Sequence, residues 1–301
     1  MRSEQRTLGG YSLVELLLVV ALIALVVSQT MLAFTSQHKT YMVQERVVDA
    51  QHDARLLADS IVRDLRMAGF MVPRDVGIGS IDGGTGAPDM LCMSDSGAFV
   101  ESSFEDATDR FDAPSLTAAV STGDTSVTMS ASSMDIDGDA TNDFVVGEGI
   151  LISDGTNAHC GLITGVSSGA VQFVPGSAAG ATLPALSASA VPAVVYQISG
   201  TTLTRNSVPL SNEVDDFQVE FWVDADGDGL QDGGEFPVHD LNGSDLTEVR
   251  MARVHITTHT ASGDVDFTGQ RPASANRAGA GSTDNLRRRK VTADVRLRNL
   301  R

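Results

Sequence analysis

The chain has 301 residues, enough for an extended helix together with a folded domain that has a core of its own. It is acidic, with 21 Lys and Arg against 39 Asp and Glu and a formal net charge of −18, which works against binding to nucleic acid or to anionic lipid. The sequence contains no Walker loop, dinucleotide fingerprint or Gly-x-Ser-x-Gly elbow, so we expect a protein that is not an enzyme.

A short leader, residues 1–10, precedes a long apolar run. The leader ends in a glycine pair, and residues 13–34 contain one charged side chain, that of Glu15. About 20 apolar residues suffice to cross the core of a bilayer, so the run predicts a single membrane span. A carboxylate within such a span costs roughly 2.5 to 3.5 kcal/mol on insertion, so Glu15 indicates a functional contact with a positive group.

The order of these features resembles the prepilin signature of type IV pilins and of type II secretion pseudopilins. A glycine, Gly10, is followed by an aromatic residue, Tyr11, and then by the acid Glu15 in the apolar run. The resemblance implies cleavage after Gly10 by a prepilin peptidase, N-methylation of Tyr11, and pairing of Glu15 with an N-terminal amine during filament assembly. The alternative is a plain signal anchor with an incidental glutamate.

Residues 11–68 contain neither Gly nor Pro, which predicts one unbroken transmembrane and stalk helix about 87 Å long. Beyond Tyr41 apolar residues recur every three or four positions, and a helix face of this kind packs on a folded domain. Gly69 is predicted to end the helix. The predicted face consists of Val43, Val47, Ala50, Ala54, Leu57, Ile61, Leu65 and Ala68.

The sequence after Gly69 changes to short runs of β-forming residues separated by clusters of Gly, Asp, Ser and Pro. It predicts a β-rich globular head over residues 69–301, with an inserted β subdomain at about 112–191. The predicted fold class is therefore α+β, with a long N-terminal hydrophobic α-helix packed on a β-rich head.

Several segments resemble PilW-type minor pilins. They are "DARLLADSIVRDLRMAGF" at residues 53–70, "VVYQISGTTLTRN" at 194–206, "VDDFQVEFWVDADGDG" at 214–229, "VRMARVHITTHT" at 249–260, and the terminal "RRRKVTADVRLRNL". Many major pilins carry a proline in the membrane helix, and this chain has Leu32 where they often have it. The partial melting associated with that proline is therefore not expected here.

This resemblance implies a minor pilin that joins other minor pilins at the tip of a type IV pilus and primes its polymerisation. The implied partners are the major pilin, the prepilin peptidase, the inner-membrane assembly platform and a tip adhesin. The chain would sit in the inner membrane with its head in the periplasm, and later in the extracellular pilus. Two alternatives stay open, a minor pseudopilin of a type II secretion system and a tip module that binds a surface, a sugar or DNA. With one Trp and three Tyr, the chain has little aromatic material for such a binding groove.

The strongest chemical motif is the acidic stretch "DADGDGLQDGGE" at residues 224–235. It has the spacing of a twelve-residue calcium loop, with a glycine at the sixth position and a backbone carbonyl at the seventh. We expect a strand-flanked Ca²⁺ site; a solvated acidic turn without an ion is the alternative. The expected ligands are Asp224, Asp226, Asp228, Asp232, Glu235 and the carbonyl of Leu230.

A second acidic stretch, residues 135–143, lacks the glycine at its sixth position, where Ala140 stands, and is predicted to be an ordinary turn. His255 and His259 lie four residues apart in a β-type run, where they lack the helical geometry of a zinc pair.

The chain has two cysteines, Cys92 and Cys160. In an exported head they would form one disulfide between the early head and the inserted β region, and two buried thiols are the alternative. On the chain-entropy model, closing a loop of about 70 residues contributes roughly 4 kcal/mol of stability.

Overall fold

The computed structural model describes residues 12–99, 110–176 and 182–300. Gly10 and Tyr11, the two residues of the predicted processing site, lie outside the described residues. The chain divides into two compact units, residues 1–46 and 47–301, which are described separately below.

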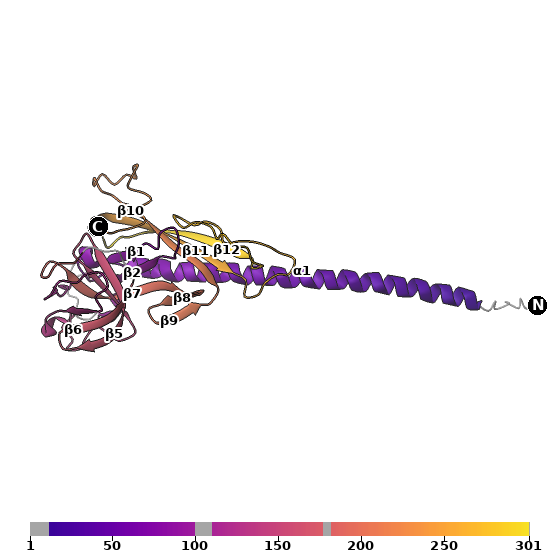
Figure 1. Ribbon diagram of the computed structural model, residues 1–301, viewed down its shortest axis with the longest axis horizontal. Coiled ribbons are helices and arrows are strands. Elements are labelled where there is room, and N and C mark those ends of the chain that lie inside the picture. Colours follow the sequence, from indigo (N-terminus) through magenta and orange to yellow (C-terminus); the bar gives the residue numbers. More distant parts are fainter. Residues whose placement is uncertain (1–11, 100–109, 177–181, 301) are drawn as a thin grey trace, which may run out of the picture. The chain divides into compact units, whose positions relative to one another are not determined.

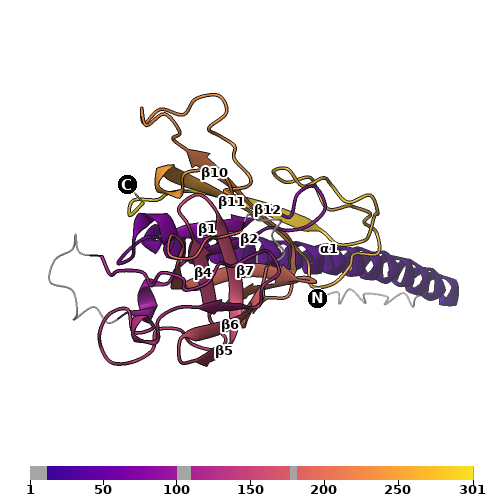
Figure 2. The ribbon, with the colours of Figure 1, turned by 60° about the vertical axis from the view of Figure 1, so that its left-hand side comes forward.

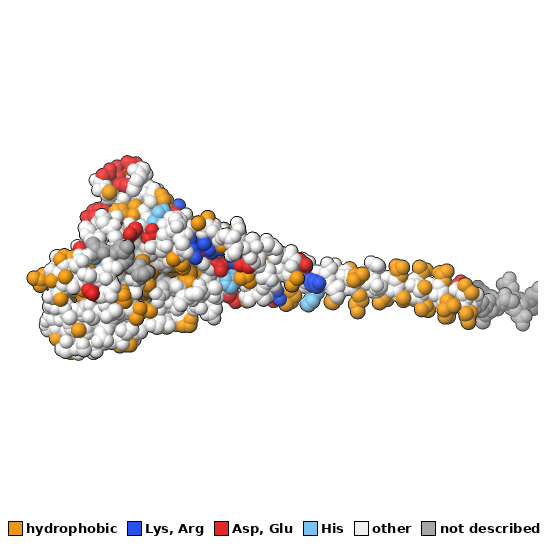
Figure 3. Space-filling view, in the orientation of Figure 1, with side chains coloured by type: hydrophobic (Ala, Val, Ile, Leu, Met, Phe, Trp, Pro, Cys, Tyr) orange, Lys and Arg blue, Asp and Glu red, His pale blue; other side chains and the backbone are white. Residues whose placement is uncertain are grey.

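The first unit is the beginning of helix α1, which runs from Leu13 to Met67. Every residue from Leu13 to Tyr41 is exposed, and Figure 3 shows apolar side chains along this part of the helix. The hydroxyl groups of Thr30 and Thr35 donate to the carbonyls of Val26 (2.8 Å) and Leu32 (2.9 Å). These two hydroxyl groups are therefore satisfied within the helix and add little to the cost of entering lipid. By length and composition α1 can cross a membrane.

The second unit contains the rest of α1 and two antiparallel sheets (Figures 1 and 2). In the described part of the chain the larger sheet has nine strands in the order β1-β2-β7-β4-β5-β6-β3, with β8 paired to β7 and β9 to β8. Its strands are β1 (Ile78–Ile81), β2 (Met90–Ser94), β3 (Ser126–Thr128), β4 (Gly149–Ser153), β5 (Ala158–Ser167), β6 (Ala170–Pro175), β7 (Ser189–Ser199), β8 (Thr202–Arg205) and β9 (Val208–Ser211).

The smaller sheet consists of β10 (Val214–Val223), β11 (Val249–His259) and β12 (Arg288–Arg296), in that order. Short 3₁₀ turns lie between these elements: η1 (Arg74–Val76) between α1 and β1, and η2 (Ser96–Ala98), η4 (Ala131–Ser133) and η5 (Leu246–Glu248) between strands. The α+β class predicted from the sequence, a long apolar helix followed by a β-rich head, is confirmed.

One face of α1 forms part of the core of this unit. Leu57, Ile61 and Leu65 are buried together with residues from both sheets, among them Tyr196 of β7 and Val254 of β11. The shorter side chains of the same face are also buried, namely Ala50, Ala54, Ala58 and Ala68. The periodic apolar residues of the sequence therefore mark the helix face that packs on the head.

Polar contacts fix α1 against both sheets. Asp64 accepts hydrogen bonds from Tyr196 Oη on β7 and from Arg205 Nε on β8, each at 2.7 Å. On the other sheet, the hydroxyl of Thr258 donates to the carbonyl of Ala50 at 2.7 Å. These contacts set the rotation of the helix about its axis, which burial of apolar groups alone leaves loosely defined.

Helix α1 ends at Met67, just before the stop predicted at Gly69, and distant residues satisfy the polar groups at its end. Gly69 has φ of 75°, a left-handed conformation that favours glycine, and its N–H donates to Ser94 Oγ at 2.8 Å. Asn299 Nδ2 donates to the carbonyl of Arg66 at 3.0 Å. The C-terminal tail therefore caps the helix, and Leu300 is fully buried beside Gly69.

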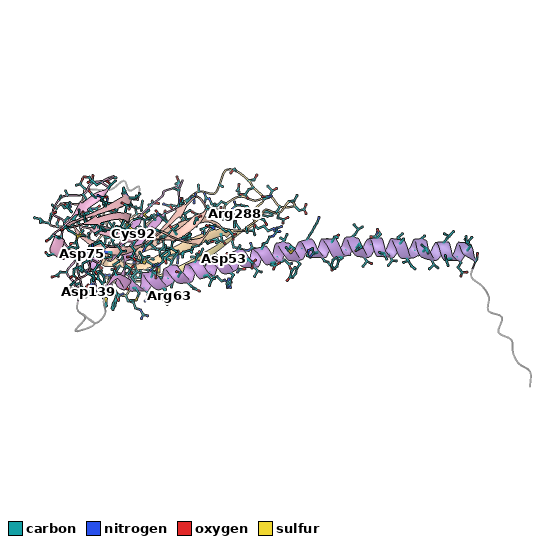
Figure 4. The ribbon with its side chains drawn as sticks, turned by 90° about the horizontal axis from the view of Figure 1, so that it is seen from below. Asp53, Arg63, Asp75, Cys92, Asp139 and Arg288 are labelled. Carbon is teal, nitrogen blue, oxygen red and sulfur yellow. A yellow bond between two sulfur atoms is a disulfide. The ribbon has the colours of Figure 1, made fainter. Side chains whose placement is uncertain are left out.

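The predicted disulfide between Cys92 and Cys160 is confirmed; Cys92 is labelled in Figure 4. Cys92 lies in β2 and Cys160 in β5, three steps apart in the strand order, which would separate them by ~14 Å in a flat sheet. Their Cα atoms are 6.3 Å apart. The larger sheet therefore curls back on itself, and the disulfide joins the two sides of the curl.

The region predicted as an inserted subdomain contributes β3 to β6 to the larger sheet. Many of its buried residues, from Leu116 to Ala190, form a second hydrophobic cluster, whereas Leu151, Ala158 and Cys160 belong to the main core. That this region forms a separate subdomain stays a prediction.

A buried carboxyl group, that of Asp89, covers the edge of β10 that β11 leaves free. Its two oxygens accept from the N–H groups of Gly83 (3.0 Å) and Val219 (2.8 Å), and its own N–H donates to the carbonyl of Phe217. Burial raises the pKa of Asp89 to about 7, and the negative charges of Asp82 and Asp216 act in the same direction. Because the native state then holds this proton more tightly than the unfolded chain, the stability that Asp89 contributes is lost as the pH rises from about 4 to about 7.

We predict that the stability difference between the full-length protein and its Asp89→Asn variant shrinks as the pH is raised from 5 to 8. At pH 5 the variant should be less stable by about 1 to 3 kcal/mol, because an amide N–H would face a backbone N–H. Thermal unfolding of both proteins in the same detergent measures this, and the other titrating groups, which the two proteins share, cancel in the comparison. A difference that stays constant over this range would contradict the prediction.

Candidate functional site

The predicted calcium loop follows β10 directly, and Figure 3 shows acidic side chains gathered there. Oxygen atoms of Asp224, Asp226 and Asp228, one from each carboxylate, lie within 4.8 Å of one another. Gly227 and Gly229 both have φ of 74°, and this left-handed backbone brings the acids together. The glycine that the motif required at its sixth position, Gly229, therefore makes the turn that the prediction assigned to it.

The last acid of the motif, Glu235, has a different environment. It is buried, and its carboxylate accepts from the N–H groups of Ala225 (2.9 Å) and Asp232 (3.2 Å) and from Trp222 Nε1 (3.2 Å). The hydrogen bond from Asp232 is the main cause that lowers the pKa of Glu235. Glu235 thus holds the two ends of the loop together, and the converging group comprises neither it nor Asp232.

A distant arginine contributes to the loop. Arg250 Nε donates to Asp224 Oδ2 at 3.1 Å, and the same guanidinium also pairs with Glu248. Burial would raise the pKa of Asp224, but the hydrogen bonds from the Gly229 N–H and from Arg250 outweigh it and lower the pKa. Asp224 is therefore ionised, and part of its charge is already neutralised.

The three converging carboxylates fit a hard divalent cation. Ca²⁺ binds oxygen ligands at about 2.3 to 2.6 Å, so two of its ligands lie at most about 5 Å apart, a limit that this group meets. The exposed Asp226 and Asp228 leave one side of the group open to solvent. The backbone N–H groups of Asp228 and Leu230, which donate to Asp226 Oδ1 and Asp228 Oδ1, hold these carboxylates in place.

A second group of acids converges where the sequence predicted an ordinary turn. Asp135, Asp137 and Asp143 each offer an oxygen within 4.8 Å of the other two, and Asp137 and Asp143 are buried. Burial raises the pKa of Asp143 to about 6, and the charges of its two neighbours add to the effect. Asp139, labelled in Figure 4, lies outside the group, because its carboxylate accepts from Thr141. The missing glycine was therefore a poor guide to whether these acids meet.

A hydrogen-bonded row crosses the smaller sheet, and the sequence analysis did not find it. Glu220 Oε2 lies 3.1 Å from His255 Nε2, and His255 Nδ1 lies 2.9 Å from Thr292 Oγ1. Burial lowers the pKa of His255, although the hydrogen bond to Glu220 acts in the opposite direction. Glu220, His255 and Thr292 lie on the same face of the smaller sheet. That they meet follows only from the pairing register of β10, β11 and β12, which a single sequence does not show.

In the first unit, Glu15 lies in the first turn of α1. A carboxylate at this position interacts favourably with the positive end of the helix dipole. Because residues 1–11 are not described, the pairing of Glu15 with an N-terminal amine stays a prediction.

Among solved structures, the chain is similar to a type IV-like pilin from Thermus thermophilus. The two share 12% sequence identity with a TM-score of 0.38, over 83% of this chain and 98% of that chain. No protein-family model and no curated protein matches the chain. The function proposed below therefore rests on the residues of this chain.

Proposed function

We propose that this chain is a minor pilin of a type IV pilus, of the PilW type, which joins other minor pilins at the tip and primes polymerisation. One observation carries the proposal. A single uninterrupted helix, α1, begins as an exposed apolar segment long enough to cross a membrane, with Glu15 in its first turn, and ends as part of the core of a β-rich head. A cleavable signal sequence would have no need to continue into the core of the mature protein.

The proposed assembly step uses two groups near the N-terminus, the amine of Tyr11 and the carboxylate of Glu15. Cleavage after Gly10 by the prepilin peptidase would free the amine of Tyr11, which is then methylated. In the bilayer, Glu15 would pair with an N-terminal amine, because an uncompensated carboxylate there costs several kcal/mol. That pairing would set the axial register of neighbouring subunits. The subunit would lie in the inner membrane, with its head in the periplasm and contacts to the assembly platform, and afterwards at the pilus tip, where it contacts the major pilin and a tip adhesin.

The proposal predicts that Glu15→Ala separates membrane insertion from assembly. The variant should accumulate in the inner membrane at the wild-type level or above, since it lacks a costly carboxylate, while its incorporation into pili falls roughly tenfold or more. Glu15→Asp, which keeps the charge on a shorter side chain, is the matched control and should retain part of the wild-type incorporation into pili. Immunoblots of membranes and sheared pili measure both quantities, and mass spectrometry of the N-terminal peptide reports cleavage after Gly10.

Normal incorporation of Glu15→Ala, or an intact leader on the chain in sheared pili, would refute the proposal. A deletion strain distinguishes the two filament systems. Loss of pili with intact secretion supports the minor pilin, whereas loss of secretion with intact pili assigns the chain to a pseudopilus.

We also propose that the loop after β10 binds one Ca²⁺ through Asp224, Asp226 and Asp228, with Asp232, Glu235 and the Leu230 carbonyl as the further ligands that the motif predicts. Supporting it are the converging carboxylates and the left-handed glycines. The role of the ion would be to remove repulsion among these acids and thereby to order the loop beside the edge of β10.

Calcium should therefore stabilise the full-length protein. With Kd on the order of 10⁻⁴ M, a hundredfold excess of Ca²⁺ adds about 2.7 kcal/mol to the free energy of unfolding. Thermal unfolding in EDTA and in 10 mM calcium measures the shift. The variant Asp226→Asn/Asp228→Asn should lose it, and the matched variant Asp135→Asn/Asp137→Asn should keep it. If the second variant loses the shift instead, the ion binds at the other acidic group and the assignment is wrong.

A further inference from the structure

A hollow of about 300 Å³ lies beside α1, where the helix meets the chain that links β9 to β10. Its apolar lining comes from Leu56 and Leu57 of α1 and from Leu210 of β9. Leu56 is 55% exposed and Leu210 is 37% exposed, so this apolar surface is open to solvent.

Two acidic residues, Asp53 and Glu213, also line the hollow. Both are half-buried, and the described residues supply neither an ion pair nor a hydrogen bond to either carboxylate. By contrast, Asp64 and Asp224 are paired with arginines. An apolar floor with two unpaired carboxylates fits a side chain that has an apolar stem and a cationic end, which is the chemistry of Arg and Lys.

The chain carries such side chains on the free edge of β12. Arg289, Lys290 and Arg296 are exposed, and no acidic partner for them occurs among the described residues. The register also leaves backbone groups free on this edge. The N–H of Thr260 donates to the carbonyl of Arg287, and that of Leu297 to the carbonyl of Arg250, so the odd-numbered residues of β12 pair with β11. The N–H and C=O groups of the alternate residues, such as Lys290, therefore point away from the sheet.

The hollow and the basic edge lie at the same level along α1, the hollow beside β10 and the basic edge on β12, the two outer strands of the smaller sheet. Val214 of β10 pairs with Thr258 of β11, and Thr258 pairs with Arg289 of β12. Thr258 contacts Ala50 of α1, and Asp53 follows less than one turn later. Glu213 directly precedes Val214, and strands β10 and β12 are ~10 Å apart across β11. Figure 4 labels Asp53 on α1 and Arg288, the neighbour of Arg289, on β12.

From this arrangement we propose that a second copy of the chain docks side by side, with the Arg289–Lys290 end of its β12 in the hollow lined by Asp53 and Glu213. Two copies with parallel α1 helices bring the acidic hollow of one opposite the basic edge of the next. The parallel orientation rests on the proposed function, because it follows from anchoring in one membrane. The contact joins different surfaces of the two copies, so further copies can be added in the same direction.

Disulfide cross-linking of two full-length chains in the same membrane tests the proposal. One tagged chain carries Asn212→Cys at the hollow, and a chain with a different tag carries Lys290→Cys. Mild oxidation should give a dimer that contains both tags. The matched control replaces Lys290→Cys with Val174→Cys; Val174 is 59% exposed and lies in β6 of the larger sheet, outside the smaller sheet that carries the basic edge, so this variant should give little dimer.

Charge reversal then tests the chemistry of the contact. Arg289→Glu in the second chain should lower the yield of mixed dimer roughly tenfold, and Glu213→Arg in the first chain should restore it. Equal yields for Lys290→Cys and Val174→Cys, or no effect of the reversals, would overturn the proposal. A cross-link to a different protein in place of the second copy would also overturn it.

Counting pili on the same cells separates this inference from the proposed function. If pili are lost when the chain is deleted but the cross-link does not form, the docking is refuted and the pilus role stands. If the cross-link forms but pili are still made without the chain, the pilus role is refuted and the docking stands.

Discussion

The apolar face of α1 between Ala50 and Leu65 is the surface on which both sheets of the second unit pack. Its three large side chains, Leu57, Ile61 and Leu65, are buried in one cluster with β7 and β11. Burial of three such side chains contributes roughly 5 to 9 kcal/mol, and a whole domain is stable by about 5 to 15 kcal/mol. The second half of α1 is therefore an integral part of the head.

This constraint explains why the same helix can serve two environments. Along its first part the apolar side chains cover the whole circumference and are exposed, as a lipid-facing segment requires. In its last part they are confined to one face, and polar contacts from Asp64 and Thr258 fix how that face meets the strands. No proline interrupts the change between the two patterns.

Electrostatics in the head follow from its excess of acids. Two buried carboxylates show how the fold accommodates them: Asp216 contacts Arg277 at 2.5 Å and Arg271 at 3.4 Å, and Asp89 accepts from two backbone N–H groups. An uncompensated buried charge would cost several kcal/mol. The half-buried carboxylates of Asp53 and Glu213 have no such partner among the described residues. The hollow that they line is therefore the surface of the head where a cationic partner is expected.

The sequence predicted the features that depend on local pattern. Periodicity gave the buried face of α1, Gly69 gave its end, and the spacing of acids and glycines gave the convergence of Asp224, Asp226 and Asp228. Features that depend on long-range packing were not predictable in the same way.

The curl that brings β2 to β5 depends on the order of strands distant in sequence. Arg250 reaches Asp224 from 26 residues away, and Asp143 meets Asp135 although the loop lacks the expected glycine. In each case the partner is determined by register and burial, for which a single sequence carries little local signal.

Hydrogen exchange of the full-length protein in detergent tests the central claim most directly. If α1 is part of the core of the head, the amides of residues 54–65 should exchange only by global unfolding, with the same opening free energy as those in the centres of β7 and β11. Faster exchange of this helix segment, while the two strands stay protected, would show that the head is stable without α1 and would contradict the account.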